Sequence, residues 1–317
     1  MSVDGPVLVL TCADDPTSDV VLAELNNRGV PVFRCDPADV LTGRLEVSAH
    51  FGTSGARSYL RTDARTVDLS SVRSVYYRRP SSYLAPTTMS ERDGRFAKEQ
   101  AKHGMAGIVA SVRGRWVNHI WRAVEAEFKP TQLIAAREAG FVVPPTIITN
   151  RVDDVRDFTK EQGSIVYKPL QNTDLAGSDG TAAAIWVDEV EASKLDAGLG
   201  LTLHLFQRRV DKVADLRVTV IGNEIFSVRL ESPHIDWRRD YDQVRYSVVD
   251  TPVDIAAQCR RYLDKFGLLF GAFDFGLTGD GSWVWYECNT GGQWHWLELE
   301  TGLPMTAALA DLLEITR

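Results

Sequence analysis

The sequence predicts a mixed α/β protein (α/β or α+β) with more than one folding unit. Residues 7–10 are apolar, residues 19–28 carry apolar side chains at helical spacing, and residues 29–33 are again mostly apolar. This strand-helix-strand order begins an open parallel sheet. The second half of the chain instead contains strand-like segments joined by short turns, as in antiparallel sheets. At 317 residues the chain exceeds the ~100–200 residues of a common domain, which favours about two units.

The composition excludes several classes of protein. A hydrophobic fraction of 44% and a charged fraction of 25% are ordinary for a folded chain, and the net charge of −8 argues against a protein that coats nucleic acid. The N-terminus does not resemble a secretion signal and no apolar run reaches ~18 residues, so a cytoplasmic protein outside the membrane is expected. The four cysteines form no CxxC pair and the six histidines no HExxH motif, so any metal is expected on oxygen ligands.

The remaining elements of the first unit follow at short intervals. They are a hairpin over 45–51 and 57–61, a strand over 72–77, a helix over 90–108 and an irregular segment over 113–118. A unit boundary is expected near 121–128.

The middle and the end of the chain predict further helices, strands and loops. In the middle these are a helix over 129–139 with Gly140 as its C-cap, strands over 146–149 and 164–167, a glycine-containing polar loop over 170–180 and a strand over 181–187. Towards the end they are strands over 203–210, 215–221 and 224–230, a helix over 255–266, and a hairpin over 269–277 and 282–288. The turn dipeptide Gly222-Asn223 joins the second and third of these strands.

Asp274, Glu287 and Asn289 form the most informative constellation. Glu287 and Asn289 are two apart on one strand, so their side chains leave the same face, and Asp274 can meet them across the hairpin. Two carboxylates and an amide oxygen suit Mg²⁺, whose coordination substrate phosphates usually complete. The alternative is that both carboxylates are solvated strand residues. The aromatic residues around them favour a concave, largely apolar site, where a bound cation offsets the cost of burying carboxylates.

Cationic residues nearby could serve phosphate. Lys168 follows an apolar strand and precedes the glycine-containing loop, where an ammonium group can reach phosphate oxygens. Lys129 is a second candidate, and both lysines could instead be ordinary surface residues. Asp215 and Arg217 share a strand face by alternation, and Arg217 with Arg238 could neutralise a phosphoryl group in transfer. The alternative for these arginines is a pair of structural salt bridges.

The two lysines, the Asp-Leu-Arg element and the late Asp and Glu-Cys-Asn set resemble the ATP-grasp superfamily in order and spacing, over essentially the whole chain. The resemblance implies an N-terminal pre-ATP-grasp βαβ domain over 1–122, a central subdomain over 123–205 and a C-terminal subdomain over 206–317, with ATP and Mg²⁺ held between the last two. It also implies a role for each candidate residue: ATP phosphates on Lys129 and Lys168, adenine on the hinge residues Gln207, Arg208, Arg209 and Val210 largely through backbone, ribose on Asp215, catalysis by Arg217 and Arg238, and metal on Asp274, Glu287 and Asn289.

Shorter motifs resemble the graspetide maturases, the ribosomal-peptide ligases that make compounds such as the microviridins. These motifs are Val75-Tyr76-Tyr77-Arg78-Arg79-Pro80, Trp116-Val117-Asn118-His119, Lys129-Pro130-Thr131-Gln132-Leu133, Val143-Pro144-Pro145-Thr146 and Gly291-Gly292-Gln293-Trp294. The sequence departs from the family at Thr290 and Ile120, where proline is common, and at Arg208, which replaces a frequent glutamate beside the hinge.

By this resemblance the protein phosphorylates a side-chain carboxylate of a ribosomal precursor peptide, which has a leader and a core. A Ser or Thr hydroxyl or a Lys amine then closes an ω-ester or ω-amide ring. A homodimer is also implied, and neither nucleic acid nor membrane is expected as a partner. The alternatives are a ligase that adds free amino acids to a protein tail and an ATP-binding module without turnover. A dinucleotide-binding oxidoreductase is excluded, because residues 11–16 lack the GxGxxG glycines.

Overall fold

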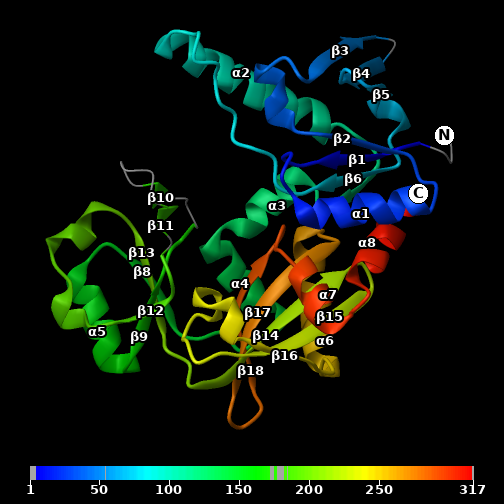
Figure 1. The fold of residues 1–317 in the computed structure, drawn as a ribbon. Coiled ribbons are helices and arrows are strands. Elements are labelled where there is room, and N and C mark those ends of the chain that lie inside the picture. The colour runs from blue at the N-terminus through cyan, green and yellow to red at the C-terminus, as the bar shows by residue number, and fades with distance from the viewer. Residues whose placement is uncertain (1–4, 54, 172–174, 177–181, 184, 316–317) are drawn as a thin grey trace.

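The computed structural model describes residues 5–53, 55–171, 175–176, 182–183 and 185–315, and Figure 1 shows them arranged in three lobes. The first lobe is built on a parallel sheet in the order β2-β1-β6-β7. Its strands are β1 (Val7–Leu10), β2 (Val32–Cys35), β6 (Ser74–Tyr77) and β7 (Arg115–Val117). The predicted strand-helix-strand start is confirmed. The prediction of an irregular segment over 113–118 is wrong, because three of its residues pair with β6.

Helices and a small antiparallel sheet complete the first lobe. They are α1 (Pro16–Asn27), α2 (Glu91–Ala110), β3 (Glu46–Gly52), β4 (Gly55–Arg61) and β5 (Thr66–Asp68). The expected hairpin and the expected long helix are therefore present. Ser90 caps α2, because its hydroxyl accepts a hydrogen bond from the backbone N–H of Asp93 at 3.1 Å.

Two helices connect the first lobe to the rest of the chain. They are α3 (Ile120–Glu127), which lies where only a boundary was expected, and α4 (Lys129–Ala139). The predicted end of α4 is confirmed, since Gly140 follows it in the left-handed conformation, with a φ of 95°.

The second lobe is a four-stranded antiparallel sheet in the order β12-β9-β13-β8. Its elements are β8 (Thr146–Thr149), α5 (Val152–Gln162), β9 (Ile165–Lys168), β12 (Asp188–Val190) and β13 (His204–Arg208), with the short pair β10 (Leu175–Ala176) and β11 (Ala182–Ala183). A strand over the whole of 181–187 is wrong, because 185–187 are not in a strand; residues 181 and 184, like 172–174 and 177–180 of the predicted loop, lie outside the described residues.

The third lobe is an antiparallel sheet in the order β16-β15-β14-β17-β18. Its strands are β14 (Lys212–Ile221), β15 (Glu224–Glu231), β16 (Arg245–Val248), β17 (Phe270–Thr278) and β18 (Trp283–Asn289), and its helices are α6 (Val253–Phe266), α7 (His295–Thr301) and α8 (Met305–Glu314). Short 3₁₀ segments are η1 (Pro37–Leu41), η2 (Leu69–Ser71), η3 (Ala192–Lys194), η4 (Ala197–Leu201), η5 (Trp237–Arg239) and η6 (Tyr241–Gln243).

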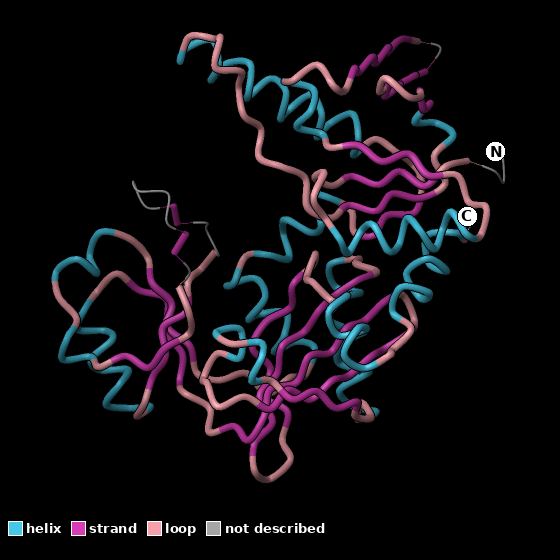
Figure 2. Tube along the Cα trace, viewed as in Figure 1, coloured by secondary structure: helices cyan, strands magenta, loops and turns pink. Residues whose placement is uncertain are grey.

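The end of the chain returns to the first lobe. In Figures 1 and 2 the C-terminal helix α8 lies beside α1, and one hydrophobic core contains Val21 and Leu25 of α1 together with Leu309 and Leu313 of α8. Arg28 fastens the pair, because its Nη1 donates to Asp311 Oδ1 at 2.5 Å. The first and third lobes therefore share a core. None of the helices among the described residues combines the length and the apolar character that a membrane span requires.

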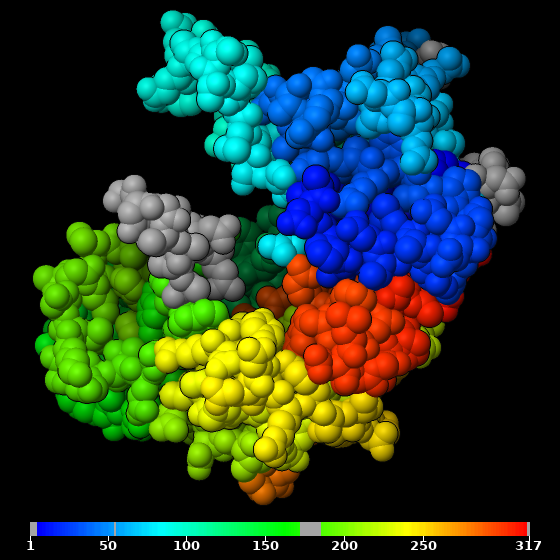
Figure 3. All heavy atoms as spheres, viewed as in Figure 1, coloured from blue at the N-terminus to red at the C-terminus, as the bar shows by residue number. Residues whose placement is uncertain are grey.

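The second lobe lies apart from the other two on one side. In Figure 3 the surface is hollowed between the second lobe, drawn in green, and the body formed by the first and third lobes. The strands that carry candidate residues come from both sides of this hollow, because β9 and β13 belong to the second lobe and β14, β17 and β18 to the third.

Candidate active site

The hairpin of β17 and β18 places the predicted metal ligands together. Asp274 pairs directly with Glu287, and Asn289 lies two residues further along the same strand. The amide nitrogen of Asn289 donates to Asp274 Oδ2 at 3.3 Å and to Glu287 Oε1 at 3.4 Å. A bulge leaves Tyr286 as the extra residue of β18 at this point. The structure thus brings the three side chains onto one face, as alternation predicted.

Three cations surround the two carboxylates. Arg217 Nη1 donates to Asp274 Oδ1 at 2.8 Å, and Lys129 forms a close ion pair with Glu287. Arg238 Nη2 bridges both acids, at 3.0 Å from Asp274 Oδ2 and 3.2 Å from Glu287 Oε1. Because each oxygen is already neutralised by a positive charge, the cost of burying the carboxylates is offset without a metal.

The positive charges also change the acidity of Glu287. Burial alone would raise the pKa of this carboxyl, but the charges of Lys129, Arg238 and Lys168 hold the pKa well below its usual value. Glu287 is therefore ionised at neutral pH and available as an anionic ligand.

Lys168 reaches the same cleft from the second lobe. Its ammonium donates to Gln207 Oε1 at 2.7 Å and lies 4.3 Å from the centre of the Tyr286 ring. Gln207 is itself fixed, because its amide donates to Thr146 Oγ1 at 2.9 Å. Burial, with neighbouring cations that include Lys129, lowers the pKa of Lys168 to about 8. The side chain of Gln207 thus orients a lysine.

The predicted hinge, Gln207 to Val210, lies at the end of β13. The backbone N–H of Arg208 donates to Pro145 O at 2.9 Å and that of Arg209 to Ser164 O at 2.8 Å. The strand ends at Arg208, and the Val210 carbonyl accepts from the N–H of Lys212 at 3.0 Å. Two of the backbone donors expected to meet adenine are therefore engaged with neighbouring strands.

Asp215, the predicted ribose ligand, has a partner that the sequence did not suggest. Lys212 Nζ lies 2.5 Å from both carboxylate oxygens of Asp215 and donates to Ile235 O at 2.8 Å. Burial raises the pKa of Asp215 to about 6, although the charge of Lys212 opposes this shift. A register shift between Lys212 and Ala214 allows residues three apart to meet, which a strict period of two does not predict.

Arg238 is likewise held by residues outside the predicted set. Asp236 Oδ1 accepts from the backbone N–H of Arg238 at 3.2 Å and from its Nη1 at 3.3 Å. The guanidinium lies 5.1 Å from the ring centre of Trp237. The sequence signal was an aspartate at the start of a short helical turn, where Asp is a common N-cap.

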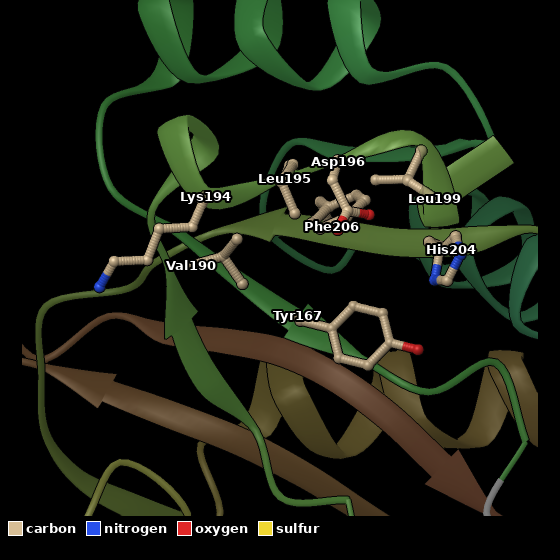
Figure 4. Close-up of a pocket in the computed structure, with 8 residues that line it drawn as sticks. All are labelled: Tyr167, Val190, Lys194, Leu195, Asp196, Leu199, His204 and Phe206. Atoms are coloured by element: carbon tan, nitrogen blue, oxygen red, sulfur yellow. The ribbon is translucent and has the colours of Figure 1, made fainter.

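A cavity in the second lobe lies away from this chemistry. Tyr167, His204 and Phe206, drawn in Figure 4, line a space of about 230 Å³. Tyr167 and Phe206 alternate with Lys168 and Gln207 along their strands, so the cavity opens on the opposite face of the sheet. In the described part of the chain, no three His, Cys, Asp or Glu side chains cluster to hold a metal ion. The candidate metal ligands are therefore two carboxylates and one amide, those of Asp274, Glu287 and Asn289.

Comparisons with known proteins find chains with the same overall fold. Residues 6–124 match the family model described as the MvdD pre-ATP grasp domain. The macrocyclase MdnC from Microcystis aeruginosa MRC is 25% identical with a TM-score of 0.86, over 97% of this chain and 98% of that one. For MdnB of the same organism the identity is 28% and the TM-score 0.80, over 98% and 99%. A RiPP-associated ATP-grasp ligase from Chryseobacterium gregarium is 22% identical with a TM-score of 0.90, over 98% and 96%, and shows the same fold. No curated protein sequence matches the chain.

The chain has the fold of an ATP-grasp ligase, as the sequence predicted. The chain is similar to maturases of the graspetide type, because its first lobe matches the family model of the MvdD pre-ATP-grasp domain and its whole chain aligns with the macrocyclases MdnC and MdnB.

Proposed function

We propose that this ligase closes rings in a ribosomally made precursor peptide, by an ADP-forming activation of side-chain carboxylates. The observation that carries the proposal is the charge balance of one cluster. Lys129, Arg217 and Arg238 contact the carboxylates of Asp274 and Glu287, and Lys168 adds a further positive charge nearby. This excess of cations suits a polyanionic ligand such as the phosphates of ATP.

Residues on the two sides of the cleft bind different parts of the nucleotide in this proposal. We assign the phosphates to Lys129 and Lys168, the ribose to Asp215 and the adenine to the hinge at Gln207–Val210. Within the hinge, the N–H groups of Arg208 and Arg209 are engaged with neighbouring strands, so the adenine contact is assigned to Val210. ATP then lies between a central subdomain over 123–205 and a C-terminal subdomain over 206–317, with the pre-ATP-grasp domain over 1–122 beside them.

Asp274, Glu287 and Asn289 would hold Mg²⁺. The donor set fits this ion, since it consists of two carboxylates and, once the Asn289 side chain turns its oxygen toward them, one amide oxygen. Arg238 now occupies the position between the two carboxylates, so the guanidinium and a metal ion compete for the same oxygens. Bound Mg²⁺ would neutralise phosphate charge. Structures of PsnB, another ATP-grasp ligase, contain a minimal precursor, Mg and ADP.

The chain contributes to the reaction mainly by positioning and by charge. The peptide carboxylate attacks the γ-phosphorus of ATP, the bond to the β-γ bridging oxygen breaks, and ADP leaves. Arg217 and Arg238 are placed to neutralise the charge of the phosphoryl group in transfer. A peptide hydroxyl or amine then attacks the acyl carbon and expels phosphate, so each bond removes one water from the peptide. Side chains of the enzyme supply no nucleophile in this scheme.

The peptide partner is proposed from the relatives. The structure of MdnC contains its precursor peptide MdnA, and the Chryseobacterium ligase was crystallised with ADP and with a leader and core peptide. By analogy we propose a precursor with leader and core as the substrate here. The sequence resemblance alone supports the further proposal of a cytoplasmic homodimer.

Nucleotide analysis tests the proposal. With its cognate precursor, ATP and Mg²⁺, the protein should release ADP, and hydroxylamine should trap the activated carboxylate as a hydroxamate. AMP and pyrophosphate would overturn the mechanism. A mass gain equal to a free amino acid would favour the tail-adding ligase instead.

A further inference from the structure

Arg78 links the first lobe to the turn that follows β18. This residue belongs to the Tyr-Tyr-Arg-Arg-Pro motif, and its side chain is 1% exposed. Its Nη1 donates to the carbonyl oxygens of Gly291 at 2.9 Å and Gly292 at 3.1 Å, and its Nη2 donates to Gln293 Oε1 at 2.8 Å. Two motifs that lie 215 residues apart in sequence are therefore direct partners.

Residues of the first lobe hold both partners of this contact, Arg78 and Gln293. Asp15, also 1% exposed at its side chain, lies 3.6 Å from Arg78 Nε. Asp15 is held by Thr11, whose hydroxyl donates to Oδ2 at 2.7 Å, and Thr17 donates to Gln293 Oε1 at 2.6 Å. The guanidinium of Arg78 thus lies between a buried anion and three oxygen acceptors of the turn, which leaves it little freedom to move.

The other side of the same turn packs on Arg217. The Gln293 carbonyl accepts from Arg217 Nη2 at 3.1 Å, while Arg217 Nη1 donates to Asp274. Gly292 is in equally close contact, because a Cβ at this position would lie 2.7 Å from Arg217 Nη2. The turn and Asp274 together therefore hold the Arg217 guanidinium in position.

We infer that Arg78 is a positioning residue for phosphoryl transfer. It holds the 291–293 turn from the first lobe and thereby keeps Arg217 aimed at the phosphoryl group. The inference rests on the proposed function, since it assigns Arg217 to that step. It gives the pre-ATP-grasp domain a part in the chemical step, in addition to any part in peptide binding.

Two variants of Arg78 test the inference against a purely structural role. Arg78→Lys keeps a positive charge beside Asp15 but loses the forked donor geometry, and Arg78→Gln also loses the charge. The neighbouring Arg79 is exposed, so Arg79→Gln is the matched control. Val21→Ala, in the buried core of the same lobe, supplies a variant of lowered stability that removes no hydrogen bond to the turn.

The first readout is steady-state ADP release with the cognate precursor. Both Arg78 variants should lower kcat by about 10–100-fold while the KM for ATP changes less than about 3-fold, since a small misplacement of a catalytic group costs rate more than binding. Arg79→Gln and Val21→Ala should keep a near-normal kcat. The inference is overturned if the Arg78 variants match wild type, if they change only the KM for the peptide, or if Val21→Ala of equal melting temperature loses as much kcat.

The second readout does not require the peptide. Orthovanadate imitates a phosphoryl group in transfer, so calorimetry should show that wild type binds Mg²⁺-ADP with vanadate more tightly than Mg²⁺-ADP alone. Arg78→Lys and Arg78→Gln should lose about 10-fold of this preference, whereas Arg79→Gln should retain it. Full preference in both Arg78 variants would overturn the inference. Wild type that shows the preference but makes no ADP with the peptide would count against the proposed substrate and leave the role of Arg78 supported.

Discussion

Replacing Glu287 by Gln removes one negative charge from the cleft while conserving the shape of the side chain. One carboxylate oxygen of Glu287 forms the ion pair with Lys129, and the other accepts from Arg238 at 3.2 Å. The side chain is 18% exposed, so water screens these contacts only weakly. In the variant, Lys129 and Arg238 both lose the negatively charged partner that Glu287 provides.

The structure sets the expected size of the effect. Breaking a buried ion pair costs about 3–5 kcal/mol, and we expect about 2–3 kcal/mol for Glu287→Gln because the amide oxygen still accepts hydrogen bonds. At about 2–4 °C per kcal/mol, the melting temperature should fall by roughly 4–12 °C. The pKa of Glu287 is held well below its usual value, so its stabilisation is fully present above the unfolded pKa of about 4.3 and is lost as pH falls through the lower folded value.

Thermal melts can distinguish an effect on folding stability from an effect on the proposed metal site. They are recorded under four conditions: without ligand, with Mg²⁺ alone, with ADP alone, and with both. Wild type should gain most with both ligands together. Glu287→Gln should keep the gain from ADP, lose the further gain from Mg²⁺, and lose turnover by about 100-fold or more. Glu231→Gln, which removes an acid from a more exposed ion pair, should change stability by less than about 1 kcal/mol. Normal turnover and an unchanged melting temperature in Glu287→Gln would refute the reasoning.

Three further changes probe other parts of the cleft. Burial lowers the pKa of Lys168 to about 8, so the ADP affinity measured by calorimetry should weaken as the pH rises through that value. In Lys168→Arg the ADP affinity should stay constant over this pH range. An equal pH dependence in both proteins would assign the titration to another group. Gly292→Ala should lose about 1–3 kcal/mol of stability and also lose turnover, because the added Cβ would lie 2.7 Å from both Ala272 Cβ and Arg217 Nη2; a wild-type melting temperature and rate would contradict tight packing of the turn. Arg238→Ala should lower kcat. Without nucleotide, the variant should bind Mn²⁺ more tightly than wild type, because the guanidinium no longer competes for the carboxylates of Asp274 and Glu287. An unchanged Mn²⁺ affinity, measured by paramagnetic resonance, would exclude that competition.

The elements with clear local patterns were predictable from sequence. The first strand-helix-strand unit and the hairpin of β17 and β18 have strong apolar runs and turn residues, and both are confirmed. The helix α5 was missed because Val155 is its one buried residue among those the structure describes, so its apolar signal is weak. The helix α8 was missed for the opposite reason. It is apolar on several sides because it packs against α1 in another lobe, and such long-range packing leaves no local pattern.

The candidate site was predictable where alternation holds and not where it breaks. A period of two placed Asp215 with Arg217 and Glu287 with Asn289, and the strand register agrees. Lys212 could not be found in this way, because an irregularity in β14 brings it to Asp215. The partnership of the two distant motifs that meet at the turn after β18 was equally out of reach, since nothing local in either motif indicates the other.

The ratio of ADP formed to water lost from the peptide tests the central claim most directly. The protein would be incubated with ATP, Mg²⁺ and the precursor encoded beside its gene, with ADP quantified by chromatography and the peptide mass followed over time. We predict one ADP for each water lost, with the peptide mass falling in steps of one water and Glu287→Gln producing neither. ADP formed without loss of water from the peptide, or water lost with AMP as the nucleotide product, would contradict ring closure through γ-phosphoryl transfer.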